Sequence, residues 1–135
     1  MKWLQVERWV ILLASLAAAA FALWNLIDEI RPSWDYLVIF ECWGAWCLFP
    51  CVNALIGCRA KRPGLVRTST VLALLYAYFY SHYAFNGSTR GKTGAEHMHL
   101  DLVPILSAFL FVSVHALGLI MPPLRRMINR PFQSS

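Results

Sequence analysis

Five histidine and acidic residues could perform chemistry together near one surface of this 135-residue chain. They are Glu41, His82, His97, His99 and Asp101. Imidazole nitrogens and carboxylate oxygens bind zinc, copper, iron or nickel, so the set predicts a divalent transition metal as a candidate cofactor. A proton or ion relay is an alternative, because Glu41 within a membrane would be costly without a partner such as His82. Structural pairing of the same side chains is the simpler interpretation.

Two further polar residues, Asn53 and His115, fall inside apolar stretches of the sequence. A histidine at membrane depth is a functional candidate by default. It can also form a hydrogen bond with a serine, a tyrosine or a backbone carbonyl of a neighbouring helix, which would make it structural. The sequence contains no HExxH, GxSxG, P-loop or dinucleotide-binding motif, which favours a non-enzymatic protein without excluding an enzyme.

Small residues recur at helical spacing in the first two apolar stretches, where they predict close helix contacts in lipid. The predicted packing residues are Ala14, Ala18, Ala22, Gly44, Cys47, Cys51, Ala54 and Cys58. A thiol or soft-metal site is the alternative for the cysteines. All four cysteines lie between residues 42 and 58 and none form a CxxC pair, so redox chemistry would require a second subunit.

Two other features of the apolar stretches allow both a functional and a structural interpretation. Pro50 should kink its helix near Trp46 and so mark a hinge or pocket, although structural helices also contain such kinks. Tyr76, Tyr80 and Tyr83 share one helix face. They predict an aromatic belt whose hydroxyls reach interfacial water, with a ligand-binding aromatic cleft as the alternative.

The elements that must position these residues are four apolar stretches, at residues 9–27, 36–58, 68–85 and 102–121. Each has roughly the length needed to cross a hydrocarbon core of about 30 Å. The chain is 59% hydrophobic and only 14% charged, which is unusual for a soluble domain. We therefore expect an all-α, polytopic membrane protein: one domain, residues 1–135, folded as a four-transmembrane-helix bundle with short connections, an outer loop at 86–101 and a basic C-terminal tail at 122–135.

The positions of the cations predict the orientation in the membrane. Nine of the twelve Lys and Arg residues fall on one side of the predicted bundle and three on the other. This positive-inside bias places both termini in the cytoplasm and favours the inner (plasma) membrane. Lys2 and Arg8 before an alanine-rich run also resemble a signal peptide, but removal of that stretch would leave an odd number of helices. Cations split in this way present no basic face to nucleic acid, so the expected partners are the lipid bilayer and another membrane protein or further copies of the chain.

Three functions are compatible with these patterns. The first is a small accessory subunit or partner-recognition protein of a membrane complex, which acts by binding. The second is a small oligomeric transporter or an ion- or proton-conducting protein that uses Glu41 and His82. The third is a membrane-embedded, metal-dependent enzyme or metal sensor.

Overall fold

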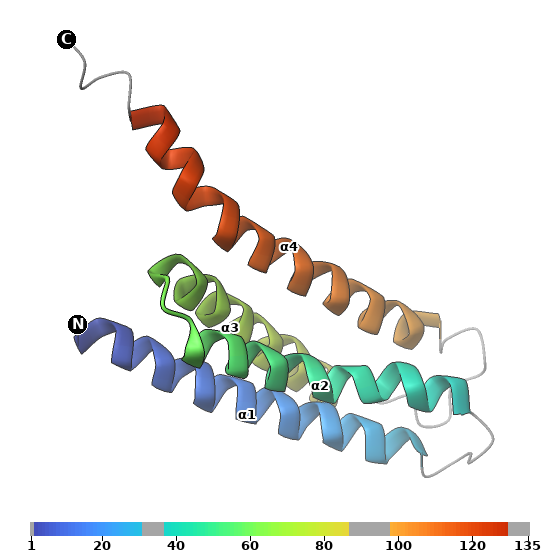
Figure 1. The fold of residues 1–135 in the computed structure, drawn as a ribbon. Helices are drawn as coiled ribbons and strands as arrows, with labels where there is room; N and C mark the ends of the chain where they lie inside the picture. The colour runs from blue at the N-terminus through green and yellow to red at the C-terminus, as the bar shows by residue number, and fades with distance from the viewer. Residues whose placement is uncertain (1, 31–36, 87–97, 130–135) are drawn as a thin grey trace.

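The computed structural model describes residues 2–30, 37–86 and 98–129, with side chains placed for 2–27, 44–85 and 104–129. These residues form four α-helices and no strand (Figure 1). The helices are α1 (Lys2–Ile30), α2 (Leu37–Arg59), α3 (Pro63–Asn86) and α4 (Met98–Asn129). The predicted all-α fold is therefore confirmed.

Three helices, α1, α3 and α4, extend beyond the apolar stretches that predicted them, and α2 matches its stretch to within one residue at each end. α1 begins at Lys2 because no proline or glycine interrupts residues 2–8, and α3 begins at Pro63, since proline suits the first position of a helix. Residues 122–129 of the predicted tail belong to α4, which continues through Pro122 and Pro123. An apolar stretch reflects the thickness of hydrocarbon, whereas a helix continues until its backbone pairing is broken, so the two lengths differ.

α2 and α3 form the middle of the bundle. α1 packs against both of them, α4 packs against both from another side, and α1 does not touch α4 over the described residues. The start of α1, the α2–α3 connection and the end of α4 all lie at the same end of the molecule (Figure 1). The C-terminal end of α4 diverges from the other helices (Figure 1), and every residue from 119 to 129 except Pro122 is exposed.

Three helices approach one another closely around Gly57 of α2. A Cβ atom added to Gly57 would lie 2.7 Å from Ser69 Cβ on α3 and 2.8 Å from Ile11 Cδ1 on α1. Neither distance is compatible with a real side chain, so glycine is what permits this approach. A second close contact joins α3 to α4, where a Cβ on Gly118 would lie 2.7 Å from Thr68 Oγ1.

The connection between α2 and α3 is short and is tied to the start of α1. The Ala60 amide donates to the Ile56 carbonyl, which ends α2. Arg8 of α1 donates from Nη2 to the Ala60 carbonyl at 3.2 Å. Arg67 of α3 also lies 3.8 Å from Glu7 of α1, through Nε and Oε1. Polar contacts thus hold three helices together at the basic end.

Two helical segments of the described chain are long and apolar enough to cross a membrane, Lys2–Ile27 and Pro104–Asn129, with 26 residues each. At 1.5 Å per residue such a segment reaches about 39 Å, which exceeds the hydrocarbon thickness of about 30 Å. These two helices are candidate membrane spans. Signal sequences and buried helices of soluble proteins share the same length and composition, and crossing by all four helices remains a prediction.

Candidate functional site

A buried polar centre joins α2, α3 and α4 at the side chain of Asn53. The Asn53 Nδ2 atom donates to the backbone carbonyl of Ser69 at 2.9 Å. Its Oδ1 atom lies 3.2 Å from His115 Nε2. Asn53 and Ser69 are fully buried and His115 is nearly so. The two polar residues that the sequence placed at depth, Asn53 and His115, are thus direct partners.

The hydrogen-bond pattern fixes the roles of the ring nitrogens in this centre. Because Asn53 Nδ2 already donates to Ser69, the oxygen of the amide faces His115, and His115 Nε2 must be the donor. His115 Nδ1 has no hydrogen-bond partner among the described residues. The ring of Phe111 packs edge-on against the imidazole with centroids 4.6 Å apart. The centre is therefore a desolvated contact between helices, with one ring nitrogen left unpaired.

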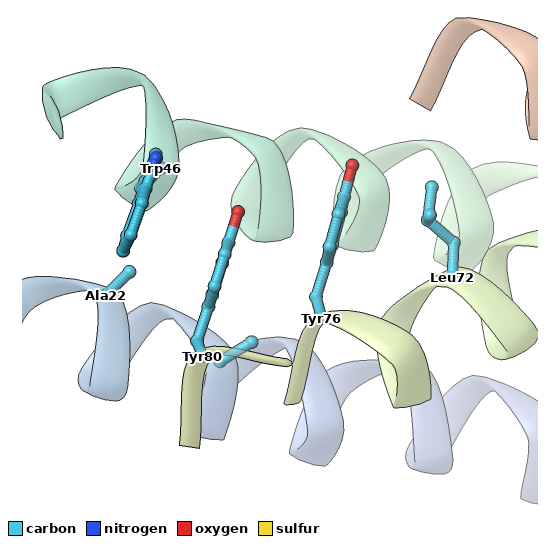
Figure 2. Close-up of a cluster of buried hydrophobic side chains, with 6 residues drawn as sticks. Ala22, Trp46, Leu72, Tyr76 and Tyr80 are labelled. Carbon is cyan, nitrogen blue, oxygen red and sulfur yellow. The ribbon is translucent and has the colours of Figure 1, made fainter. Parts of the chain in front are cut away.

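A row of aromatic rings lies between α2 and α3 (Figure 2). Trp46 stacks on Tyr80 with ring centroids 5.3 Å apart and planes 4° apart, and Tyr80 stacks on Tyr76 at 5.6 Å and 3°. Leu72 continues the row along α3 (Figure 2). All four side chains are buried. These rings form the centre of the apolar core together with Ala18 and Ala22 of α1.

The hydroxyl groups of the row bind α4. Tyr76 donates to the Ser107 carbonyl at 3.0 Å, and Tyr80 donates to Ser107 Oγ at 3.3 Å. The predicted interfacial belt is therefore wrong for these two tyrosines, because their hydroxyls find partners on a neighbouring helix and need no water. α1 is tied to the same row, since Asn25 donates from Nδ2 to the Tyr80 carbonyl at 3.4 Å.

Ser69, Ser107 and Asn25 are interior polar residues that the sequence did not single out. All three are buried and lie inside long apolar helices. The available signal was the polar side chain itself, because in lipid such a group must find a partner on another helix. Serine is common in helix interfaces, so its presence alone does not identify that partner.

The predicted metal-binding set is mostly outside the described residues. His97 lies in a segment that the structure does not describe. The side chains of Glu41, His99 and Asp101 are also not among the described ones. His82 is exposed on α3, where its ring rests against Tyr78 with centroids 6.0 Å apart. Within the described part of the chain, no three His, Cys, Asp or Glu residues lie close enough to hold a metal ion.

The predicted packing residues of α1 lie at the bundle interior. Ala18 and Ala22 are fully buried beside Trp46, and Ala14 is half-buried. Ser15, between them, is also buried, and its Oγ has no hydrogen-bond partner in the described structure.

The buried face of α2 differs by one residue from the predicted packing stripe. Among the α2 side chains that the structure describes, from residue 44 onward, the buried positions are Trp46, Pro50, Asn53 and Gly57. The predicted residues Cys47, Cys51, Ala54 and Cys58 each follow one of these, which rotates them by about 100° around the helix. Size alone guided the prediction, whereas the buried face is set by one large ring and one amide that must be paired.

The residues of the predicted stripe therefore lie in different environments. Cys51 is exposed, and no atom lies within 4 Å of a Cβ added to Gly44, so neither makes the predicted helix contact in the described structure. Cys47 packs against the edge of the core. Cys58 Sγ lies 3.9 Å from the Arg8 carbonyl on α1. Ala54 is half-buried.

Comparisons with known proteins leave this geometry as the basis for a functional inference. No family model, no curated protein and no solved structure matches the chain.

Proposed function

We propose that all four helices cross the inner (plasma) membrane, with both termini on the cytoplasmic side. The distribution of side chains supports this placement, because large apolar residues cover the described exterior while several polar residues are buried between the helices. The described interior buries the polar residues Ser15, Asn25, Asn53, Ser69, Ser107 and His115. The described exterior is dominated by large apolar side chains, among them Leu13, Leu16, Leu74, Phe109 and Val112. Such a surface is favourable in lipid and would cause aggregation in water.

The arrangement of the ends supports the same orientation. The α2–α3 connection lies at the same end of the bundle as the start of α1 and the end of α4. The cations of that end are Lys2, Arg8, Arg59, Lys61, Arg62, Arg67, Arg125 and Arg126. Their accumulation on one side of the bilayer matches the positive-inside rule.

Within the membrane, the protein acts by binding, as a small accessory subunit or a partner-recognition protein of a membrane complex. The observation that carries this proposal is the position of α4. Its inward stripe, which includes Ser107, Phe111, His115 and Gly118, attaches it to α2 and α3. Its opposite face, formed by Ile105, Phe109, Val112 and Ile120, is exposed along the whole length of the span. The polar groups at depth are used to hold α4 in place, and this outer face is available to a helix of another membrane protein.

Site-specific photo-crosslinking tests the proposal. A photoreactive amino acid at Phe109 should give one discrete adduct with a second membrane protein in the native membrane. Leu16 on α1 is the matched control, because both side chains are 69% exposed. Discrete adducts from position 109 and none from position 16 would support recognition by α4. Recovery of a monomer without adducts from position 109 would refute it.

A second candidate is an oligomeric ion- or proton-conducting protein, and His115 is the observation that favours it. The imidazole is buried in a membrane-depth contact, with Nδ1 unpaired in the described structure. Glu41 on α2 would supply a second titratable group for such a path. Proton flux in proteoliposomes should then be abolished by Glu41→Gln and by His115→Phe. Flux that is absent in the wild type or unchanged in both variants would remove this candidate.

A further inference from the structure

An open groove lies between the beginning of α3 and the diverging end of α4, at the basic end of the bundle. Its volume is about 680 Å³. The lining includes three arginines, Arg67 of α3 and Arg125 and Arg126 of α4. Its floor is formed where Gly64 of α3 approaches the Gly118 carbonyl, since a Cβ on Gly64 would lie 3.2 Å from that oxygen. The two helices separate from this floor outward.

The charge of the groove favours an anionic ligand. Glu7 is the one carboxylate that the described side chains bring to this end, and it lies 3.8 Å from Arg67. Arg125 and Arg126 have no ion-pair partner among the described residues. Two guanidinium groups of α4 are thus available, with a third beside them that is shared with Glu7. Arginine presents several N–H donors in a plane and suits the oxygens of a phosphate.

The groove is also amphipathic along its length. Leu117 and Met121 of α4 lie near the Gly118 contact, and Arg125 and Arg126 lie further towards the end of this helix. Leu117 and Arg125 are eight residues apart, which is about 12 Å along a helix. A free phosphate would use only the part beside the arginines. A phospholipid matches both parts, with its headgroup among the arginines and the first segments of its acyl chains against Leu117 and Met121.

We propose that this groove binds the phosphate headgroup of an anionic phospholipid from the cytoplasmic leaflet. The inference relies on the proposed membrane placement but not on a protein partner. Basic pockets between membrane helices on the cytoplasmic side are suited to such headgroups. The lipid fills the space between α3 and the end of α4, and so holds the end of α4 at a defined distance from the bundle.

Native mass spectrometry of the purified full chain tests the groove. The probes are phosphatidylglycerol, phosphatidylcholine and inorganic phosphate, each added to delipidated protein. We expect retention of phosphatidylglycerol over phosphatidylcholine, and a loss of about 30-fold in its affinity in the Arg125→Ala/Arg126→Ala double variant. That change corresponds to about 1 kcal/mol for each arginine. The matched control is Lys61→Ala/Arg62→Ala, which removes two exposed cations at the same end but outside the groove.

A second variant separates the shape of the groove from its charge. Met121→Trp keeps all three arginines and fills the apolar part, so it should weaken lipid binding while the thermal unfolding midpoint stays near the wild-type value. Equal losses in the groove variant and in the Lys61/Arg62 control would overturn the proposal, because they would show only general surface attraction. Full competition by inorganic phosphate with no effect of Met121→Trp would also overturn it, in favour of a simple anion site. Crosslinking from Phe109 is independent of these outcomes.

Discussion

Asn53 is the residue at which α2, α3 and α4 meet through polar contacts. Its amide nitrogen donates a hydrogen bond to the Ser69 carbonyl, and its amide oxygen accepts one from His115 Nε2. Polar contacts in membranes contribute about 0.6 kcal/mol each on average, but a group left unpaired at depth costs more. Asn53 is therefore expected to specify how the three helices fit together.

Asn53→Leu should destabilise the bundle by about 1–3 kcal/mol, because it leaves the Ser69 carbonyl and His115 Nε2 without their partner. The measurement is the thermal unfolding midpoint in a mild detergent. Leu55→Ala is the control on the same helix, since Leu55 is exposed and its truncation should change stability by less than about 0.5 kcal/mol. Equal midpoints for Asn53→Leu and the wild type would show that the polar centre adds no stability.

Gly57 gives a second prediction at this scale. Gly57→Ala places a methyl group against Ser69 and Ile11 at distances that require the helices to move, so it should cost about 1–3 kcal/mol. Gly44→Ala is the matched control on the same helix, because open space surrounds its added Cβ in the described structure. There the better helix propensity of alanine should leave stability unchanged or raise it by up to about 1 kcal/mol. The reverse order of the two variants would contradict the close approach at Gly57.

At the scale of elements, the sequence was sufficient for helix type and number but not for helix faces. Four apolar stretches predicted four helices, because hydrophobic length dominates that inference. The face of α2 could not be read in the same way. Small residues occur on several sides of this helix, and the buried side is determined by Trp46 and Asn53, whose partners lie on other helices.

The candidate site was also only partly predictable, because the sequence identified two of its residues but not their contacts. Residue type alone drew attention to Asn53 and His115, since polar groups are rare at membrane depth. Their pairing requires that α2 and α4 are neighbours in the bundle. The spacing of residues along the sequence does not reveal which helices are neighbours. The bonds of Tyr76 and Tyr80 with Ser107 required the same knowledge of helix order. The predicted metal-binding set remains a prediction, because four of its five side chains lie outside the described structure.

The one-residue offset between the buried face of α2 and the predicted packing stripe can be tested directly. Trp46→Ala removes a fully buried ring that stacks on Tyr80 and should cost about 3–5 kcal/mol. Cys47→Ala changes the adjacent, half-buried position and should cost less than about 1 kcal/mol. Chemical or thermal unfolding in detergent measures both. Comparable losses at the two positions, or a larger loss at Cys47, would place the buried face where the small-residue stripe predicted it.

For the whole molecule, the decisive property is the large apolar surface that the described helices expose. Four polar residues of the described interior, Asn25, Asn53, Ser107 and His115, form hydrogen bonds to other helices, while leucine, valine and phenylalanine side chains cover the outside. We propose that lipid covers this apolar surface. The fold also leaves the basic ends of four helices together on one side, which is the basis for both the proposed orientation and the proposed lipid groove.

The most direct test of the membrane placement is cysteine accessibility in intact cells, with a thiol reagent that does not cross membranes. Single cysteines would be introduced into a cysteine-free variant at Lys61 and Asn129 on the basic end, and at Ser33 and Gly91 in the connections predicted to lie outside. We expect labelling at Ser33→Cys and Gly91→Cys, and labelling at the other two positions only after the membrane is opened. Labelling of Lys61→Cys in intact cells, or protection at either predicted outer position, would contradict four spans with both termini in the cytoplasm.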